Sequence, residues 1–117
     1  MFKFETLDIW KKSMEFGRVI YRLSKKIPKS EQFGLTSQLI RAGMSISLNI
    51  AEGSSRKSKI DFNRFIQMAL GSLNEVVTCL YFAKSENYFT DNDFNNAYTQ
   101  SEEISKMLYG FQKYLER

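Results

Sequence analysis

The feature that most constrains how this chain can fold is a repeat of apolar residues at alternating steps of three and four. The repeat is strongest between residues 62 and 83, and it recurs in three other stretches. Such spacing places side chains on one face of an α-helix, whereas a strand needs a period of two. The sequence predicts four helices, with inward faces Ile9, Ser13, Phe16, Ile20, Leu23 and Ile27; Leu35, Leu39, Ala42, Ile46 and Ile50; Phe62, Ile66, Ala69, Leu73, Val76, Leu80 and Ala83; and Phe94, Ala97, Ser101, Ile104, Leu108, Phe111 and Leu115.

The boundaries of the first two helices follow from a proline, a serine and a glycine. Pro28 cannot continue a helix and disfavours helical backbone at the preceding residue, so the first helix is predicted over residues 8–27. Ser30 is predicted to open the second helix, because its side-chain oxygen can accept a hydrogen bond from a free amide of the first turn. Gly53 is predicted to close this helix in the left-handed conformation.

The last two helices carry clearer start signals. Ser58 and Asp61 have the spacing of a capping box, which predicts the start of the third helix. That helix should end near Asn87, and Thr90 should cap the fourth.

The predicted connections between helices are only a few residues long, which forces neighbouring helices to be antiparallel. Stripes with a mean step of 3.5 residues favour left-handed packing at crossing angles of about 20°. A length of 117 residues suits one core. The sequence therefore predicts a single all-α domain over residues 1–117, an antiparallel up-down-up-down left-handed four-helix bundle.

The residue types present exclude several kinds of chemistry. The chain has no histidine and one cysteine, Cys79, which excludes an internal disulfide, a Cys/His zinc site and a Ser-His-Asp or Cys-His triad. Cys79 lies among apolar residues, which favours a buried, unreactive thiol over a nucleophile. We therefore expect no catalytic residue, no metal, no cofactor and no enzymatic activity.

The distribution of charge also bears on location. The longest charge-free stretches, residues 42–51 and 65–74, are ten residues each, whereas a membrane-spanning helix needs about 20 apolar residues. The first residues lack the apolar region and cleavage site of a secretion signal. We expect no membrane partner and a cytoplasmic location.

The net charge of +4 is unevenly distributed. Residues 1–59 hold 12 Lys and Arg against 5 Asp and Glu, whereas residues 60–117 hold 5 against 8. The spacing of the cations predicts a basic side of the first helix and a second cluster in the loop between the second and third helices. The expected bundle brings this loop near the start of the first helix, so both clusters could follow phosphates, although a solvated lysine-rich surface is the alternative. The candidate nucleic-acid-binding residues are Lys11, Arg18, Arg22, Lys25, Lys29, Arg56, Lys57 and Lys59.

Many large apolar side chains fall outside the four stripes. Aromatic residues make up 15% of the chain, and exposed apolar patches above a few hundred Å² mark interaction sites. We expect self-association, with a wider core as the alternative. The residues concerned are Trp10, Met14, Tyr21, Phe65, Phe82, Tyr98 and Tyr109.

A polar seam also runs along the second helix at steps of 4, 4 and 3, and the fold of the hairpin brings its first residue near Glu75. This arrangement predicts an ion pair between Arg41 and Glu75 within a hydrogen-bonded network that fixes helix register, because buried charges need partners. Acid–base or metal chemistry at Glu52 and Glu75 is the weaker interpretation, since several turns separate them. The structural polar network is predicted to comprise Arg41, Ser45, Asn49, Glu52 and Glu75.

Several of these residues carry a resemblance to a known family. The matching segments are Gly34-Leu35-Thr36-Ser37-Gln38, Arg41-Ala42, Asn49-Ile50-Ala51-Glu52-Gly53 and Ala69-Leu70-Gly71-Ser72-Leu73-Asn74-Glu75, together with Pro28, Glu31, Ser45 and Phe65. Over nearly the whole chain, they resemble the four-helix-bundle proteins encoded by intervening sequences of bacterial 23S rRNA genes. One departure is Ser47, where the family commonly has a proline, so the resemblance carries no kink over to this chain.

The resemblance implies a bundle that associates into a ring, a pentamer, without enzymatic activity. The similar accessory proteins of diversity-generating retroelements are pentameric bundles whose basic surface engages nucleic acid and a reverse transcriptase. By resemblance we therefore expect a homo-oligomer that binds RNA, DNA or a nucleic-acid-handling protein. The alternative is a protein–protein interaction scaffold that uses exposed aromatic surfaces and has no nucleic-acid role.

Overall fold

The computed structural model describes all of residues 1–117 and is entirely helical. The predicted all-α class with four helices is therefore confirmed. Two short 3₁₀ helices accompany the four long ones. The elements are η1 (Lys3–Thr6), α1 (Asp8–Ser24), η2 (Lys29–Glu31), α2 (Leu35–Ser54), α3 (Lys59–Ser85) and α4 (Asp91–Leu115).

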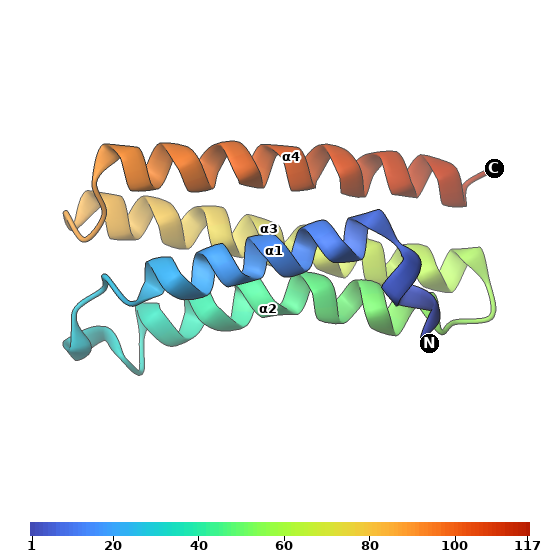
Figure 1. The fold of residues 1–117 in the computed structure, drawn as a ribbon, viewed down its shortest axis with the longest axis horizontal. Helices are drawn as coiled ribbons and strands as arrows, with labels where there is room; N and C mark the ends of the chain where they lie inside the picture. The colour runs from blue at the N-terminus through green and yellow to red at the C-terminus, as the bar shows by residue number, and fades with distance from the viewer.

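The four helices lie side by side in a bundle with extents of 44, 23 and 22 Å. In Figure 1 each helix runs opposite to the one before it in the chain. α1 and α3 each pack against both α2 and α4, so α1 and α3 occupy one diagonal of the bundle and α2 and α4 the other. The N-terminus and the α2–α3 turn lie at one end, whereas η2 and the α3–α4 turn lie at the other (Figure 1).

The core consists of the predicted stripes. A single cluster of 23 buried apolar residues runs through the bundle, and every predicted inward residue of α3 is buried. Leu35 and Phe111 are the exceptions among the predicted faces, because each lies half-buried at the edge of this cluster. The three-four spacing therefore identified the side that each helix turns to its neighbours.

The start signals of the last two helices are confirmed. The Ser58 hydroxyl accepts a hydrogen bond from the Asp61 amide at 3.1 Å. Thr90 and Asp93 form a reciprocal capping box at the start of α4. α3 ends as expected before Asn87, which has a positive φ of 62° and reverses the chain.

The connection between α1 and α2 is longer than predicted. α1 ends at Ser24 rather than at residue 27, because the following amides bond to carbonyls three residues back. Ser30 does not open α2, which begins at Leu35 without a side-chain cap. Instead the Glu31 amide donates to the Pro28 carbonyl at 2.9 Å, which closes η2 as a 3₁₀ turn.

Gly53 has a different role from the predicted left-handed cap. It lies within the last turn of α2, and no glycine of the chain has a positive φ. A Cβ atom at this position would lie 2.7 Å from the Cβ of Phe65 and 2.8 Å from Cδ1 of Phe62. Gly53 is therefore required by the close approach of α2 and α3 beside their connecting turn.

α3 is apolar enough, by length and composition, to cross a membrane. Its mean hydropathy over 18 residues is 1.2, and 33% of that window is buried in the bundle. The ten-residue limit on charge-free stretches did not indicate that α3 is this apolar. Glu75 alone interrupts an otherwise uncharged stretch between Arg64 and Lys84. The inward stripe of α3 is buried, and its exposed large apolar side chains are Ile60, Met68, Tyr81 and Phe82.

An ion pair joins the turn after α1 to the start of α4. Lys26 Nζ lies 2.8 and 2.9 Å from the two carboxylate oxygens of Asp93. The two hydrogen bonds from Lys26, together with those from Thr90, hold the pKa of the Asp93 carboxyl below its usual value, against the opposing effect of burial.

Replacing Asp93 with asparagine should lower the free energy of unfolding at pH 7 by about 1 kcal/mol. The depressed pKa means that the stabilisation is fully present above the unfolded-state pKa of about 3.9 and is lost as pH falls through the folded-state pKa. Urea titrations of both proteins should therefore differ at pH 7 and converge in strong acid. A difference that stays constant across this range would contradict the assignment to the Asp93 carboxylate.

Candidate nucleic-acid interface

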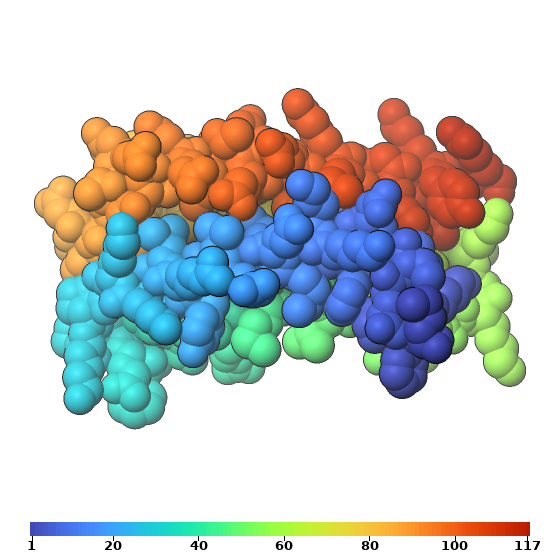
Figure 2. Space-filling model, in the orientation of Figure 1, coloured from blue at the N-terminus to red at the C-terminus, as the bar shows by residue number.

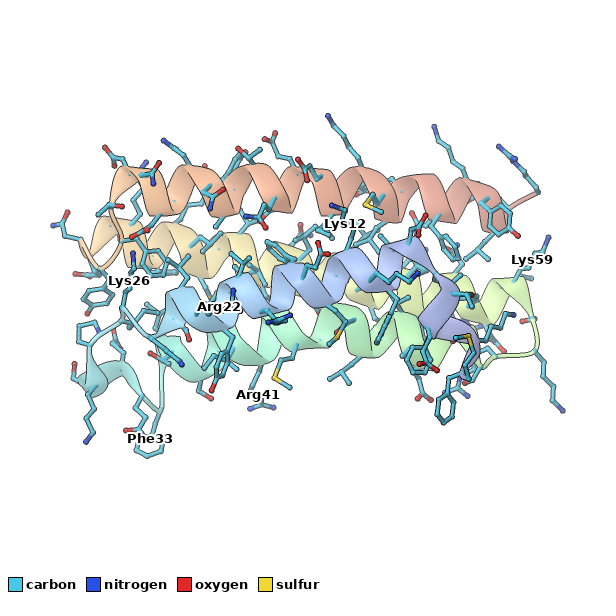
Figure 3. The ribbon with its side chains drawn as sticks, viewed as in Figure 1. Lys12, Arg22, Lys26, Phe33, Arg41 and Lys59 are labelled. Carbon is cyan, nitrogen blue, oxygen red and sulfur yellow. The ribbon has the colours of Figure 1, made fainter.

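α1 presents a basic side that faces away from the core. Lys11, Arg18, Arg22 and Lys25 are all exposed and recur at steps of 7, 4 and 3. At about 3.6 residues per turn these steps keep the four cations on the side of α1 opposite the buried Phe16. Figure 3 shows Arg22 on this helix. At about 1.5 Å per residue, the cations span roughly 21 Å along the helix axis.

Most of the predicted contact residues keep their charge unpaired. Of these residues only Arg56 takes part in an ion pair, with Glu52. Glu15 lies within the basic side, but it is paired with Lys12 at 3.9 Å. The remaining ion pairs of the structure are Lys26–Asp93 and Arg64–Asp61, and neither includes a predicted nucleic-acid-binding residue.

The α2–α3 turn holds the second basic cluster. Arg56 lies over the ring of Phe65, with Cζ 4.6 Å from the ring centroid. Lys59 donates to the carbonyl of Arg117 at 3.2 Å, which brings the start of α3 beside the end of α4. Lys57 is exposed between them. Figure 3 places Lys59 at this end of the bundle.

The α2–α3 turn lies at the same end of the bundle as the N-terminus, which leads into α1 (Figure 1). Figure 2 shows α1 running across the middle of one face, between α4 and α2. η1 packs against both α1 and α2 and carries a further exposed cation, Lys3. The sequence prediction missed Lys3, because a four-residue 3₁₀ helix has no periodicity to detect. Lys29 lies at the opposite end, in η2.

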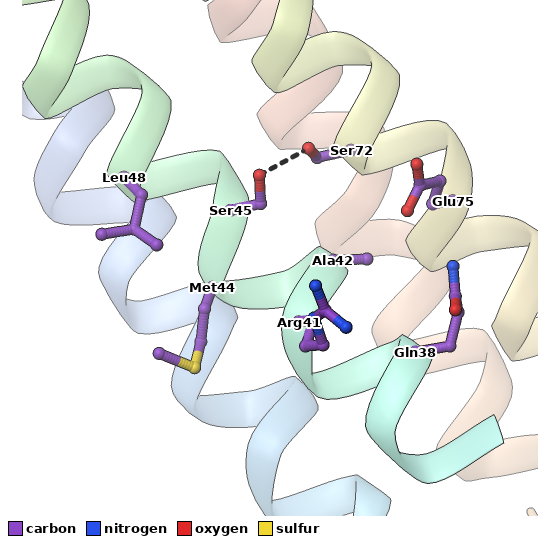
Figure 4. Close-up of a pocket in the computed structure, with 8 residues that line it drawn as sticks. All are labelled: Gln38, Arg41, Ala42, Met44, Ser45, Leu48, Ser72 and Glu75. Carbon is purple, nitrogen blue, oxygen red and sulfur yellow. Dashed lines mark hydrogen bonds between the residues drawn. The ribbon is translucent and has the colours of Figure 1, made fainter. Parts of the chain in front are cut away.

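The uncharged members of the predicted polar network do form hydrogen bonds. The Ser72 hydroxyl donates to the Ser45 hydroxyl at 2.9 Å, which joins α3 to α2 (Figure 4). The Asn49 amide donates to the Ser45 hydroxyl at 3.0 Å and to the Ser45 carbonyl at 2.9 Å. The sequence prediction did not include Ser72, whose inward position on α3 depends on how the two helices are rotated against each other.

The charged members of the predicted network lie outside it. Arg41 and Glu75 line the same groove of about 470 Å³ between α2 and α3 (Figure 4), but they form no ion pair. Glu52 pairs with Arg56 instead. The prediction assumed that these charges were buried, whereas all three side chains are exposed and water can solvate them.

Potential reactive groups are few around this groove. Cys79 is buried, as expected, and burial together with the charge of Glu75 raises the pKa of its thiol. This thiol therefore stays protonated near neutral pH. No three His, Cys, Asp or Glu side chains gather closely enough to hold a metal ion.

Two comparisons with known proteins match the chain. The sequence profile of the family described as 23S rRNA-intervening sequence protein matches residues 5–110. A crystal structure from Bacteroides thetaiotaomicron, described as a protein with unknown function from the S23 ribosomal protein family, is 30% identical in sequence. It covers 90% of this chain and 98% of its own, with a TM-score of 0.83. Among curated proteins, none matches. The resemblance noted in the sequence is thereby confirmed, and the chain belongs to the 23S rRNA-intervening sequence protein family.

Proposed function

We propose that this protein is a non-enzymatic, homo-oligomeric helical bundle of the cytoplasm that binds structured nucleic acid through its basic face, alone or within a ribonucleoprotein. The observation that carries the proposal is the row of exposed cations on α1 that have no acidic partner, Lys11, Arg18, Arg22 and Lys25.

The geometry of this face suits phosphates better than bases. Its cations lie on the outer side of α1, between the flanking helices α2 and α4, and lysine and arginine side chains commonly contact phosphates. A row of about 21 Å spans the axial rise of roughly six base pairs of a duplex at about 3.4 Å each, and its four cations can contact at most four of the phosphates along that length. Contacts of this kind position a protein on a duplex without reading its sequence.

The proposal is tested by fluorescence anisotropy with a labelled RNA hairpin and a labelled DNA duplex. Phosphate contacts predict binding that weakens steeply between about 50 and about 200 mM salt. Binding at low salt with such a slope would support the proposal. No binding of either probe at about 50 mM salt would overturn it.

Replacing Arg18, Arg22 and Lys25 together with alanine should weaken binding of every probe. Each lost phosphate contact removes about 0.9 from the slope of log affinity against log salt, so the loss of affinity between about 50 and 200 mM salt should become about 40-fold smaller. The matched control removes three exposed cations from α3 and α4, Arg64, Lys106 and Lys113. If both triple variants lose the same affinity, net charge rather than the α1 face drives binding.

A second candidate function is supported by the exposed aromatic side chains. Phe33 is 92% exposed and Phe82 is 61% exposed, and side chains of this type are enriched at protein interfaces. A protein-recruiting scaffold would use these residues and would bind no nucleic acid. The same anisotropy titration distinguishes the two functions, because a scaffold predicts no binding at low salt.

A further inference from the structure

The outward side of α2 and α3 has the composition of an interface rather than of a solvated surface. α2 contains only two charged residues, Arg41 and Glu52, in 20 positions. α3 contains only Glu75 between Arg64 and Lys84. The α1 and α4 sides carry most of the remaining charge, so the low charge is confined to one half of the bundle.

Large apolar side chains project from this same side. Leu48 is 61% exposed and Met44 is 50% exposed on α2, and Phe82 and Met68 are similarly exposed on α3. Phe33 extends from the segment before α2, away from the bundle (Figure 3). We call the surface formed by Phe33, Arg41, Met44, Leu48, Met68, Glu75 and Phe82 the α2–α3 face.

The α2–α3 face is hollowed rather than flat. The groove of about 470 Å³ adjoins a second groove of about 660 Å³ that extends toward Phe33 and Phe82. Gln38, Arg41 and Glu75 line both. A surface of low charge with a continuous depression and projecting apolar side chains can receive side chains of a partner.

The two charges in the grooves determine which partner fits. Arg41 and Glu75 have opposite signs, lie on neighbouring helices, and have no ion-pair partner within the chain. A second copy of this face offers the same two charges, so Arg41 of each copy can meet Glu75 of another. A basic or an acidic partner would satisfy one charge and oppose the other.

We infer that copies of this chain associate through the α2–α3 face, with α2 of one copy against α3 of the next and Arg41 paired with Glu75 across the contact. The inference rests on the homo-oligomer of the proposed function and adds the surface that forms it. The size of the face is compatible with this role: 20 residues of α2 span about 30 Å. Across a bundle 23 Å wide, that is roughly 700 Å² in projection, against about 800 Å² per partner in standard interfaces.

This assembly would leave the basic face accessible. α1 lies diagonally across the bundle from α3 and turns its cations away from the core. Copies that meet through α2 and α3 would therefore keep the basic sides of α1 at the outside of the assembly. Several copies would then present repeated cation rows to one nucleic acid, which raises affinity through effective concentration.

Charge reversal tests the contact between copies. Arg41→Glu and Glu75→Arg should each reduce the mass of the assembly in sedimentation velocity, because like charges then face each other. An equimolar mixture of the two variants should form heavier species than either variant alone, since the introduced glutamate of one variant meets the introduced arginine of the other wherever unlike copies touch. A ring with an odd number of copies keeps one contact between like copies, so recovery in such a ring is partial. A gain of mass only on mixing requires an intermolecular pair. Variants that stay assembled alone, or a mixture no heavier than either variant alone, would overturn the inference.

A second pair of variants tests the apolar part of the contact without changing the Arg41–Glu75 pair. Leu48→Lys should dissociate the assembly while circular dichroism and thermal unfolding still report a folded bundle. Tyr109→Lys, at an α4 residue that is 56% exposed, is the matched control and should not change the mass. Dissociation by both variants, or by neither, would count against the α2–α3 face.

Two further outcomes separate this inference from the proposed function. A wild-type protein that sediments as a monomer, or that floats with phosphatidylcholine vesicles in a manner abolished by Leu48→Lys, would overturn the α2–α3 contact. Nucleic-acid binding by such a monomer would leave the basic-face proposal intact. An assembly that obeys the charge-reversal test but binds neither RNA nor DNA would retain the contact and reject the nucleic-acid role.

Discussion

Replacing Phe16 with alanine should lower the free energy of unfolding by about 3–5 kcal/mol. Phe16 is 2% exposed and is among the largest fully buried side chains of the chain. It lies near the middle of α1, where the cavity left by the lost ring cannot be filled by solvent or by fraying of a helix end. The loss would be a large part of the total stability of a small domain, about 5–15 kcal/mol.

The Phe16 prediction is checked by urea titration followed by circular dichroism. All variants should be measured at one protein concentration, because association stabilises the folded state by mass action. Tyr109→Ala removes an exposed aromatic ring and should change the free energy by no more than about 0.5 kcal/mol. A loss of less than about 1 kcal/mol for Phe16→Ala would mean that α1 is not anchored in the core as described.

The sequence predicted the inward faces well because one physical requirement dominates them. A helix in a bundle must bury one stripe, and Phe16 or Leu73 can satisfy this requirement only at the spacing observed. The caps at Ser58 and Thr90 were also predictable, since their hydrogen bonds join residues three positions apart. Buried stripes and caps depend only on residues of one helix, so the sequence of that helix is enough to predict them.

The errors have two sources, a local alternative turn and a contact between helices. Ser30 had the right residue type for a cap, but the chain closes a 3₁₀ turn there and α2 starts later. Nothing near Gly53 in the sequence shows that α3 approaches it within contact distance. At Ser30 a local 3₁₀ turn competes with the helix start, whereas the need for glycine at position 53 is decided by the approach of α3, which local patterns do not contain.

In the candidate site, too, the features set within one helix were predictable and those set between helices were not. The basic side of α1 was predictable, because it lies opposite a stripe that the apolar spacing already identifies. The absence of an ion pair between Arg41 and Glu75 could not be predicted. It depends on how α2 is rotated against α3 and on whether the groove is open to water. The hydrogen bond from Ser72 to Ser45 depends on the same rotation.

Replacing Gly53 with alanine should lower the free energy of unfolding by about 3 kcal/mol, near the upper end of typical overpacking costs. The new methyl group would meet two neighbours at once, 2.7 Å from Cβ of Phe65 and 2.8 Å from Cδ1 of Phe62. The Phe65 atom is fixed close to the backbone, so α2 and α3 must move apart rather than only turn a ring.

The matched control for Gly53→Ala is Gly110→Ala, where an added Cβ meets nothing within 4 Å. Gly110 lies within α4, so alanine there should stabilise the protein by about 0.5–1 kcal/mol through its higher helix propensity. The two variants should change the free energy of unfolding, measured by urea titration, in opposite directions. That result would assign the loss at Gly53 to the close approach of α2 and α3. Equal effects at both positions would show that no such approach exists.

The displacement caused by Gly53→Ala should also reach the candidate interface. Phe65 is the aromatic ring over which Arg56 lies, with Cζ 4.6 Å from the centroid. A shift of Phe65 therefore moves a cation of the α2–α3 turn but leaves the α1 cations in place. We expect a reduced salt slope for nucleic-acid binding at temperatures where the variant is still folded. An unchanged slope would assign the phosphate contacts to α1 alone.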